Sequence, residues 1–547
     1  MECSEIWRVG LWPVGFTAVV LLDCQLRNPD NDTILDNTNM TQSDQIRDIG
    51  THKELFIDEA AISSMRNVRL TMNAPYQDHE PVLLPEAPWE YRLHPYATVM
   101  REGDIFRLWY LAYEWDPPAG VELPVTGAAA DAALFWRHTR GRLCYAESSD
   151  GVHWERPNLG LVQYRGSGDN NILAPAAHDP VQQAGWNGGT VFKDPTAPPE
   201  RLYKLWSEIR VAEEGKSGLS GFHSPDGLRW TACANNPVPG YADCLNVAFW
   251  DERIKQYVGY SRHWTADSRG DSYRSVRRLV SPDFENWQDL GAVLAADETD
   301  LTLPVKRNRE SRQIVDFHGN CVFRYPGTSD VYLALPEAWW HWSANPFPEG
   351  GRDQEKMGGF PDTVDVQLAT SRDGIKWQRA GGRNPFLRLG PPDAGDSKMI
   401  YAFTQPVPVG DELWVYYGGF RYGISEKVAL KRGAYFRARL RLDGFISADA
   451  PYEGGELVTV PLRFRGRKLS INADTSAGGA IRVQIEDRSG LPLAGYGIDQ
   501  ADEINGNSVR HIASWAGNAE LGQLADREVC LRFMMNGCKL YAFQFVS

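Results

Sequence analysis

The sequence has little that points to a metal centre, a disulfide framework or a nucleic-acid surface. Its eight cysteines form no CxxC pair and show no spacing typical of zinc ligands, so we expect scattered buried thiols. The formal net charge is -14, and acidic and basic residues are interspersed along the chain. This balance offers no electrostatic surface for a polyanion such as nucleic acid. This charge distribution fits a neutral or weakly charged partner better.

Long apolar runs are also scarce. One apolar stretch, from Val9 to Leu22, is too short to span a bilayer but has the length of a signal-peptide core. Glu2 and Glu5 precede it and Arg8 is the only positive charge before it, so the signal is weak. We expect residues 1–50 to form a largely disordered leader with no stable membrane span. Export to the periplasm or out of the cell stays open.

Aromatic residues and glycine are abundant instead. The 547-residue chain has 19 tryptophans, 22 tyrosines and 51 glycines. This composition is typical of many short strands joined by tight turns, so the sequence predicts an all-β protein. The length exceeds that of one ordinary core, and we expect one large domain and one small domain.

One sequence unit occurs four times, which indicates a repeat architecture. The copies are Ser148-Ser-Asp-Gly-Val-His-Trp154, Ser224-Pro-Asp-Gly-Leu-Arg-Trp230, Ser281-Pro-Asp-Phe-Glu-Asn-Trp287 and Ser371-Arg-Asp-Gly-Ile-Lys-Trp377. Asp-Gly after serine favours a hairpin turn, because the aspartate can cap the turn and glycine accepts a positive φ. The tryptophan is expected to fill the layer between neighbouring sheets. Each copy is predicted to join the outer two strands of a four-stranded sheet.

A second hairpin of alternating apolar residues precedes each copy, and a fifth hairpin follows without the turn motif. Five such sheets predict a five-bladed β-propeller over residues 51–450. The blades are expected near residues 95–156, 186–233, 243–290, 312–379 and 400–446. The segment 54–72 is expected to help close the ring. Residues 451–547 show shorter alternating strands without the repeat and predict a C-terminal β-sandwich.

Strands of one blade alternate in direction, so the turn motifs lie on one face and the starts of the innermost strands on the other. Asp194 and Asp251 fall on the turn side, and we expect them to be structural. On the opposite face, charged and polar residues recur at the beginning of each innermost strand and after each second strand. Long insertions near residues 114–142 and 337–364 also lie on that face and can shape a pocket.

This rim contains the groups that hydrolysis of a glycosidic bond requires: two carboxyl groups, basic partners and aromatic platforms. The leading candidates for catalytic acids are Glu90, Asp243 and Glu337. The candidates for substrate binding are Arg92, His94, Asn187, Glu208, Arg262, His263, Asp316, His318, Trp339, Asp396 and Tyr401. Trp339 is as well explained by packing between blades, and His94 and His318 by hydrogen bonds across the channel.

The repeated turns make the chain resemble the five-bladed glycoside hydrolase superfamily that contains families 43, 32, 62 and 117. The segments Leu55–Glu59, Pro88–Glu90, Asn246–Asp251 and Asp411–Tyr417 look like those of propeller proteins near families 32 and 43. The resemblance implies an acidic residue on the innermost strand of each of the first three blades. Asp243 matches one such position, and Glu90 or Asp58 stands at the first. Asn187 occurs where an aspartate would be expected, and the Trp-Met-Asn-Asp-Pro and Arg-Asp-Pro signatures are missing.

We therefore expect a glycoside hydrolase that acts on an oligosaccharide or polysaccharide through paired carboxylic acids. One alternative is a non-catalytic carbohydrate-binding propeller, which would lack carboxyl groups facing each other across the channel. Another is a polysaccharide lyase that uses Arg262 and His263 on a uronic acid. No cofactor or metal ligand set is called for, although a structural ion such as calcium in the channel is compatible with the predicted fold.

Overall fold

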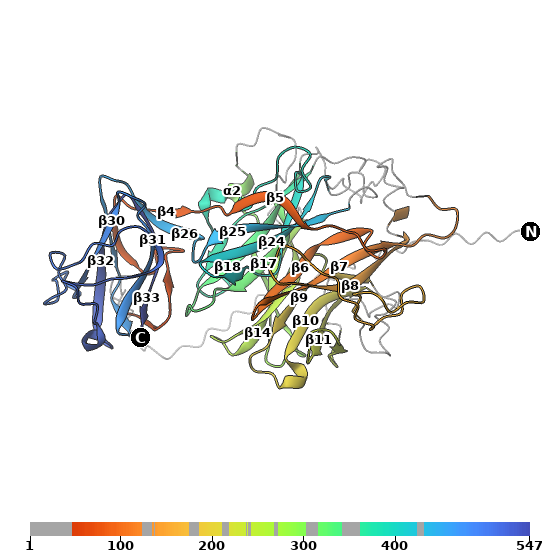
Figure 1. Cartoon of the computed structure of the whole chain (residues 1–547), viewed down its shortest axis with the longest axis horizontal. Helices are drawn as coiled ribbons and strands as arrows, with labels where there is room; N and C mark the ends of the chain where they lie inside the picture. Colours follow the sequence, from red (N-terminus) through yellow and green to blue (C-terminus); the bar gives the residue numbers. More distant parts are fainter. Residues whose placement is uncertain are drawn as a thin grey trace, which may run out of the picture. The chain divides into compact units, whose positions relative to one another are not determined.

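The computed structural model describes residues 46–122, 134–135, 137–173, 185–210, 218–236, 238, 242–266, 272–301, 303, 315–341, 362–423 and 432–547. The predicted leader and its apolar stretch therefore lie almost wholly outside the described residues. The described chain is nearly all β, as predicted (Figure 1). Its described helices are short: α2 (Glu298–Leu301) and 3-10 turns at Pro199–Arg201, Gly381–Arg383 and Gly522–Leu524. No helix in this part of the chain is long and apolar enough to cross a membrane.

Three separate antiparallel sheets come first, and we call them units 1 to 3. Unit 1 has the order β6-β7-β8, unit 2 the order β9-β10-β11-β12, and unit 3 the order β13-β14-β15-β16. The strands of units 1 and 2 are β6 (Arg92–Glu102), β7 (Ile105–Trp115), β8 (Thr139–Ser148), β9 (Gly185–Lys193), β10 (Tyr203–Arg210), β11 (Gly218–Ser224) and β12 (Thr231–Ala232). Those of unit 3 are β13 (Val247–Asp251), β14 (Gln256–Ala266), β15 (Ser272–Ser281) and β16 (Gln288–Leu294).

Units 4 and 5 belong to one ten-stranded sheet. Unit 4 consists of β17 (Val315–Arg324), β18 (Tyr332–Trp340), β20 (Ala369–Ser371) and β21 (Gln378–Arg379). Unit 5 consists of β22 (Met399–Ala402), β23 (Val407–Val409), β24 (Glu412–Phe420), β25 (Ala434–Arg441) and the early strand β5 (Tyr76–Leu83). Strand β19 (Thr363–Val366) joins the two units, because it pairs with β18 and also in parallel with β22.

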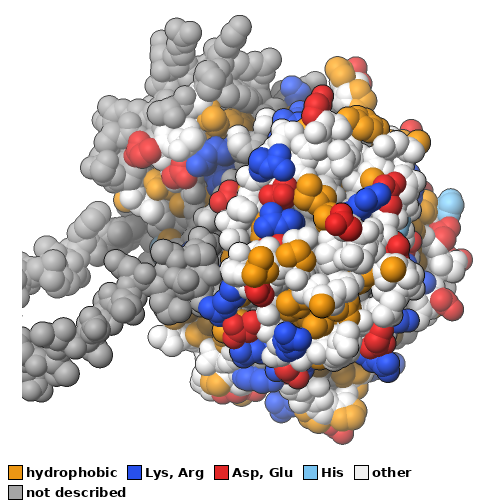
Figure 2. Space-filling view, turned by 90° about the vertical axis from the view of Figure 1, so that its left-hand side faces the viewer, with side chains coloured by type: hydrophobic (Ala, Val, Ile, Leu, Met, Phe, Trp, Pro, Cys, Tyr) orange, Lys and Arg blue, Asp and Glu red, His pale blue; other side chains and the backbone are white. Residues whose placement is uncertain are grey.

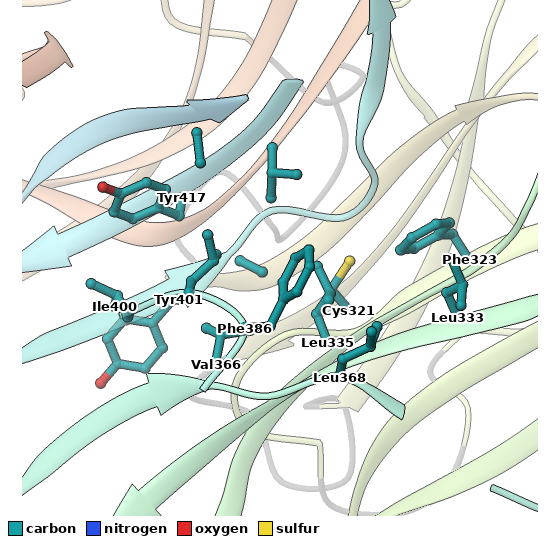
Figure 3. Close-up of a cluster of buried hydrophobic side chains, with 14 of the residues drawn as sticks. Cys321, Phe323, Leu333, Leu335, Val366, Leu368, Phe386, Ile400, Tyr401 and Tyr417 are labelled. Atoms are coloured by element: carbon teal, nitrogen blue, oxygen red, sulfur yellow. The ribbon is translucent and has the colours of Figure 1, made fainter. Parts of the chain in front are cut away.

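The first strands of the five units contact one another in a closed circle. β6 contacts β9, β9 contacts β13, β13 contacts β17, β17 contacts β22, and β22 returns to β6. A buried cluster fills the space between units 4 and 5 (Figure 3). In Figure 3, Cys321, Leu335 and Leu368 of unit 4 lie beside Phe386, and Tyr401 of unit 5 closes one side of the cluster.

The repeated motif forms the predicted turn in all four copies. In each copy the serine hydroxyl accepts a hydrogen bond from the backbone three residues on, and the aspartate accepts two more from the backbone beyond it. The residue after the aspartate has a positive φ throughout, including Phe284 at 68°, which stands where the other copies have glycine. Each turn therefore has a fixed conformation, which a neighbouring sheet can contact.

At three of the unit boundaries, an aromatic side chain of one unit donates a hydrogen bond to a turn of its neighbour. Trp109 Nε1 donates to the Gly227 carbonyl at 2.6 Å, linking units 1 and 2. Tyr260 links units 3 and 4 through the Gly374 carbonyl at 2.8 Å. Tyr416 of unit 5 donates to the Gly151 carbonyl of unit 1 at 2.7 Å, so the last unit is bonded to the first.

Asp194 and Asp251 have the structural role predicted for them. Both are fully buried. Asp194 accepts a hydrogen bond from the Tyr257 hydroxyl of unit 3, and Asp251 accepts one from the Tyr332 hydroxyl of unit 4. Their carboxylates therefore hold neighbouring units together, at the end of the first strand opposite the candidate site.

Two six-stranded sheets contain the C-terminal strands, and the early strands join them. The first contains β1 (Arg47–Gly50), β28 (Leu462–Phe464), β32 (Glu528–Asn536), β27 (Gly455–Thr459), β3 (Ile62–Arg66) and β30 (Ala480–Glu486). The second contains β31 (Asn507–Ile512), β29 (Lys468–Asp474), β33 (Cys538–Val546), β26 (Ile446–Ala450), β4 (Arg69–Met72) and β2 (Glu54–Leu55). Over these sheets, charges of both signs are interspersed with small apolar areas (Figure 2).

The expected role of segment 54–72 in closing the ring is wrong. Its strands pair with β33, β27 and β26 of the C-terminal sheets, and it is β5 that pairs with β25 of unit 5. The alternation of apolar and polar residues could not assign these strands to one sheet or the other, because an edge strand shows the same alternation beside any sheet. The expected domain limits at residues 51 and 451 remain predictions, although the pairing of residues 47–72 with the C-terminal strands does not follow them.

We predict that Gly374→Ala destabilises the protein more than Gly103→Ala. Both glycines have a positive φ, 71° and 62°, so both variants incur a backbone cost of about 1 kcal/mol. Only at Gly374 does an added Cβ meet a neighbour, the Tyr260 hydroxyl at 2.6 Å, whereas nothing lies within 4 Å at Gly103. Urea midpoints of the two variants measure the difference. Equal midpoints would show that the contact between the turn and unit 3 adds nothing.

Candidate functional site

The structure gathers most of the predicted site residues at the starts of the first strands. His94 lies on β6, Asn187 on β9, His318 on β17 and Tyr401 on β22, and Asp243 precedes β13. Arg262 on β14, Glu208 on β10 and Glu337 on β18 come from second strands. Because these strands are neighbours in the closed circle, side chains far apart in sequence, such as Tyr96 and Tyr401, meet in one cluster.

Glu337 is the most perturbed acid of the cluster. It is fully buried, and its Oε2 accepts a hydrogen bond from the Tyr96 hydroxyl at 2.8 Å. Its Oε1 is buried and has no hydrogen-bond partner among the described residues. Burial raises the pKa of Glu337 well above its usual range, and the Tyr96 hydrogen bond and the Arg262 charge only partly oppose that rise. The surroundings of this carboxyl group thus favour its protonated form.

Tyr96 connects Glu337 to a histidine that stays neutral. The Tyr96 hydroxyl lies 3.0 Å from His318 Nδ1, and that nitrogen lies 3.7 Å from Glu337 Oε2. Burial and the charges of Arg262 and Arg274 lower the pKa of His318 well below its usual range. A neutral imidazole at this place can accept or donate a hydrogen bond without adding charge.

Asp243 sits in the opposite environment. Its Oδ2 accepts from Arg262 Nη1 at 3.1 Å, and its Oδ1 accepts from Asn187 Nδ2 at 3.1 Å. Its side chain is 34% exposed, whereas that of Arg262 is 1% exposed. A buried guanidinium and an amide donor both favour the ionised carboxylate. Arg262 also donates to the His318 backbone carbonyl, which fixes its position beneath the cluster.

Asn187 connects the polar side chains around Asp243. It donates to Glu208 Oε2 at 2.7 Å as well as to Asp243, and its own oxygen lies 2.9 Å from His94 Nε2. An aspartate here would put a third negative charge between Asp243 and Glu208, and its oxygens could not donate to either. The asparagine that departs from the resembled families is therefore the residue that lets two carboxylates stay close together.

Asp316 and Trp339 form a supporting layer. Asp316 is fully buried and accepts from Arg274 Nη1 at 2.9 Å and from His341 Nε2 at 3.1 Å. Burial alone would raise the pKa of Asp316, but Arg274 and His341 hold it below its usual range. The Arg274 guanidinium lies over Trp339, and its central carbon is 4.2 Å from the centre of the Trp339 ring. Only 7% of the surface of Trp339 is exposed, so this side chain packs inside the cluster.

Arg92 and Tyr401 pack against aromatic rings at the edge of the cluster. The Arg92 guanidinium lies 5.0 Å from the centre of the Phe420 ring. Tyr401 is almost fully buried, and its ring packs against Tyr96 and His318 at 5.6 and 5.3 Å. The structure brings both residues to the site, and they support the side chains that reach into it.

Glu90 requires a correction, because its environment is that of a structural anchor. It is fully buried, and both of its oxygens accept hydrogen bonds: from Arg156, from the backbone of Glu86 and Ala87, and from Tyr110. No oxygen is left to receive or deliver a proton during a reaction. Asp58, the other first-blade candidate, is paired with Arg372 at 2.8 Å. Neither residue belongs to the cluster around Glu337.

Asp396 and His263 also lie apart from the cluster. Asp396 is fully buried and accepts from His79 Nδ1 at 2.8 Å and the Tyr417 hydroxyl at 2.9 Å. His263 follows Arg262 on β14, so the two side chains point to opposite faces of unit 3. The expectation that they bind substrate beside Arg262 is not supported by these contacts.

Sequence reasoning missed three residues of the site. Tyr96 and Arg274 lie within strands and carry no local signal of function. Gly319 did carry one, because a glycine inside a strand indicates a bulge or a close approach. The β17–β18 register shifts at this point, and a Cβ on Gly319 would lie 2.3 Å from Glu337 Oε2. Any side chain there would displace the Glu337 carboxyl.

Two expectations about the site lie largely outside the described residues. The long insertions include residues 123–133 and 342–361, which the structure does not describe. Within the described ranges, no group of three or more histidine, cysteine, aspartate or glutamate side chains is placed to hold a metal ion. The expectation that no cofactor is required, with a structural ion only compatible with the fold, stays a prediction.

No family model matches the chain, and no curated protein matches it. Solved structures do. A glycoside hydrolase matches with 12% identity and a TM-score of 0.42, over 67% of this chain and 92% of its own. A glycosyl hydrolase from Bacteroides ovatus matches with 14% identity and a TM-score of 0.40, over 71% and 97%. An N-acetylgalactosamine deacetylase from F. plautii matches with 15% identity and a TM-score of 0.40, over 68% and 96%. Likeness at this level carries no argument about function, which must come from the site itself.

We predict that Glu90→Gln lowers stability without a direct effect on chemistry. The variant removes the charge that faces Arg156 in a buried pair, and breaking such a pair costs about 3 kcal/mol. The urea midpoint should fall, while the folded fraction keeps its hydrogen bonds around Glu337. Circular dichroism during urea unfolding measures the shift, and Glu86→Gln, at the 68% exposed partner of Arg156, is the matched control. A midpoint equal to that of the control would contradict the anchoring role.

Proposed function

We propose that the five units form a five-bladed β-propeller and that the two C-terminal sheets form a β-sandwich. The closed circle of first strands and the bond from Tyr416 of unit 5 to the turn of unit 1 support the propeller. Buried apolar side chains between the two six-stranded sheets, such as Phe464, Ile485 and Phe545, support the sandwich. A propeller places all five strand starts around one channel mouth.

We further propose that the site at this mouth hydrolyses a glycosidic bond. The observation that carries this proposal is the contrast between two carboxyl groups of one cluster. Glu337 is buried, which favours its protonated form, while Asp243 is partly exposed and paired with Arg262. Glycoside hydrolysis needs this division, with one acid to protonate the leaving oxygen and one carboxylate to activate water or attack the sugar.

In this proposal Glu337 is the proton donor: Tyr96 holds its Oε2, and the buried Oε1, which has no partner among the described residues, carries the proton. Asp243 acts on the sugar or on water, with Arg262 and Asn187 keeping it ionised and oriented. The buried groups Glu208 and His94 bind sugar hydroxyls through the same hydrogen-bond network. The substrate class is an oligosaccharide or polysaccharide.

The two alternatives fare differently against the geometry. A purely carbohydrate-binding site has no need for a carboxyl group whose pKa is raised by burial, as that of Glu337 is. A lyase would need Arg262 free to neutralise a uronic acid, with a histidine base beside it. Arg262 is bonded to Asp243, and His263 points to the other face of its sheet. These contacts favour hydrolysis over elimination.

We predict that wild-type protein releases aryl aglycone from at least one member of a panel of nitrophenyl glycosides, and that Glu337→Gln and Asp243→Asn each lower kcat/KM. Loss of a proton donor or of a positioned carboxylate costs about 10²–10⁴-fold. Glu252→Gln, in an exposed turn, is the control and should retain full activity. Binding of oligosaccharide without any turnover would replace the hydrolase by the carbohydrate-binding alternative.

The raised pKa of Glu337 also predicts two pH dependences. Activity requires the protonated form, so kcat/KM should fall as pH rises through a pKa well above the usual glutamate range. Because the folded state binds this proton more tightly than the unfolded state, wild-type stability should also decrease with rising pH above the unfolded pKa. Glu337→Gln should remove that part of the stability slope. Urea unfolding from pH 5 to 9 measures it, and an unchanged slope would contradict the assignment.

A further inference from the structure

A cavity formed by described residues lies in the C-terminal sheets, away from the candidate active site. Its volume is about 650 Å³, within the usual range for sites that bind small ligands. Four chain segments form its lining: the β3–β4 turn, the ends of β26 and β29, and the β32–β33 turn. All four belong to these two sheets, so the cavity is a feature of that part of the chain alone.

A row of alternating charges crosses the cavity floor on four adjacent strands. In strand register, Asp474 of β29 faces Lys539 of β33, Lys539 faces Asp449 of β26, and Asp449 faces Arg69 of β4. All four residues line the cavity. The row has no net charge, so it selects neither an anion nor a cation. It offers donors and acceptors side by side, which is what a ligand with several hydroxyl groups can use.

Not every charged side chain of this row is paired with another member of the row. Lys539 Nζ donates to Asp449 Oδ2 at 2.7 Å and to Asn73 Oδ1 at 3.0 Å, which holds the centre of the row rigid. Asp474 accepts only from the Ser476 backbone, at 2.8 Å, among the described residues. Arg69 is exposed and makes no ion pair or side-chain hydrogen bond to the described part of the chain. The two ends of the row are therefore open to a ligand.

An aromatic side chain stands next to this floor. Tyr452 is 65% exposed and follows Pro451, which lines the cavity. Its ring rests on Gly537, another lining residue, where an added Cβ would come within 2.5 Å of it. The glycine thus lets the ring lie close against the β32–β33 turn while much of its surface remains in solvent. An exposed, positioned aromatic ring provides an apolar face against which the C–H face of a sugar can pack.

We infer that this cavity is a second saccharide-binding site, distinct from the catalytic one. Arg69 and Asp474 bind hydroxyl groups of a neutral sugar, and Tyr452 packs against its ring. The choice of a saccharide over another polyhydroxyl ligand rests on the proposed function. The site would hold the chain on a polysaccharide while the channel mouth acts on a terminus or branch.

The test measures binding and turnover separately. Binding is measured by affinity electrophoresis in gels that contain arabinan, arabinoxylan, galactomannan or mixed-linkage β-glucan, with Glu337→Gln protein so that the polysaccharide is not consumed. At least one polysaccharide should retard this protein. Adding Tyr452→Ala or Arg69→Ala should weaken the apparent affinity about tenfold, equivalent to about 1.4 kcal/mol. Tyr76→Ala removes a tyrosine that is 60% exposed elsewhere, and it should change nothing.

The outcomes separate the two proposals. With Glu337 intact, Tyr452→Ala should leave kcat/KM on a small nitrophenyl glycoside within about twofold and lower the rate on the retarding polysaccharide. Retardation that is equal in the Tyr452→Ala, Arg69→Ala double variant overturns the second site, as does a failure of all four polysaccharides to retard the protein. If no glycoside is cleaved but retardation depends on Tyr452, the second site stands and the hydrolase proposal fails.

Discussion

The hydrogen bond from an aromatic side chain of one unit to the turn of the next is the interaction on which the rest of the structure depends. Trp109, Tyr260 and Tyr416 each donate to a turn carbonyl across a unit boundary. The turns can accept because their serine and aspartate side chains have already satisfied the local backbone donors. The relative rotation of neighbouring sheets is then set by a directional contact as well as by apolar packing.

That fixed rotation determines the chemistry of the site. Asn187, Asp243 and Glu337 come from three units, and their hydrogen bonds form only if the strand starts are held in place. The same geometry produces the contrast between the acids, since Glu337 is fully buried and bonded to Tyr96, whereas Asp243 is partly exposed and paired with Arg262. We therefore expect a small change at a distant turn to alter the proton affinities in the candidate site.

The repeat and the all-β class were predictable from sequence, because turn motifs and strand alternation are local signals. The motif of Ser224–Trp230 predicts its own turn, and polar residues before strands point to one face. Glu90 was misassigned because its partner Arg156 is 66 positions away, and no local pattern reveals such a pair. Tyr96 was missed for the same reason, since its role exists only where β6 meets β17 and β18.

The pairing of β1–β4 with strands near the other end of the chain has a consequence for how the protein is made. During synthesis these four strands emerge before the five units, whereas their partners β26, β27, β28 and β33 emerge after them. The five units can form in the meantime, because their strands are close neighbours in sequence. The N-terminal strands must wait with unpaired edges, which makes them the segment with most need of a chaperone before the chain is complete.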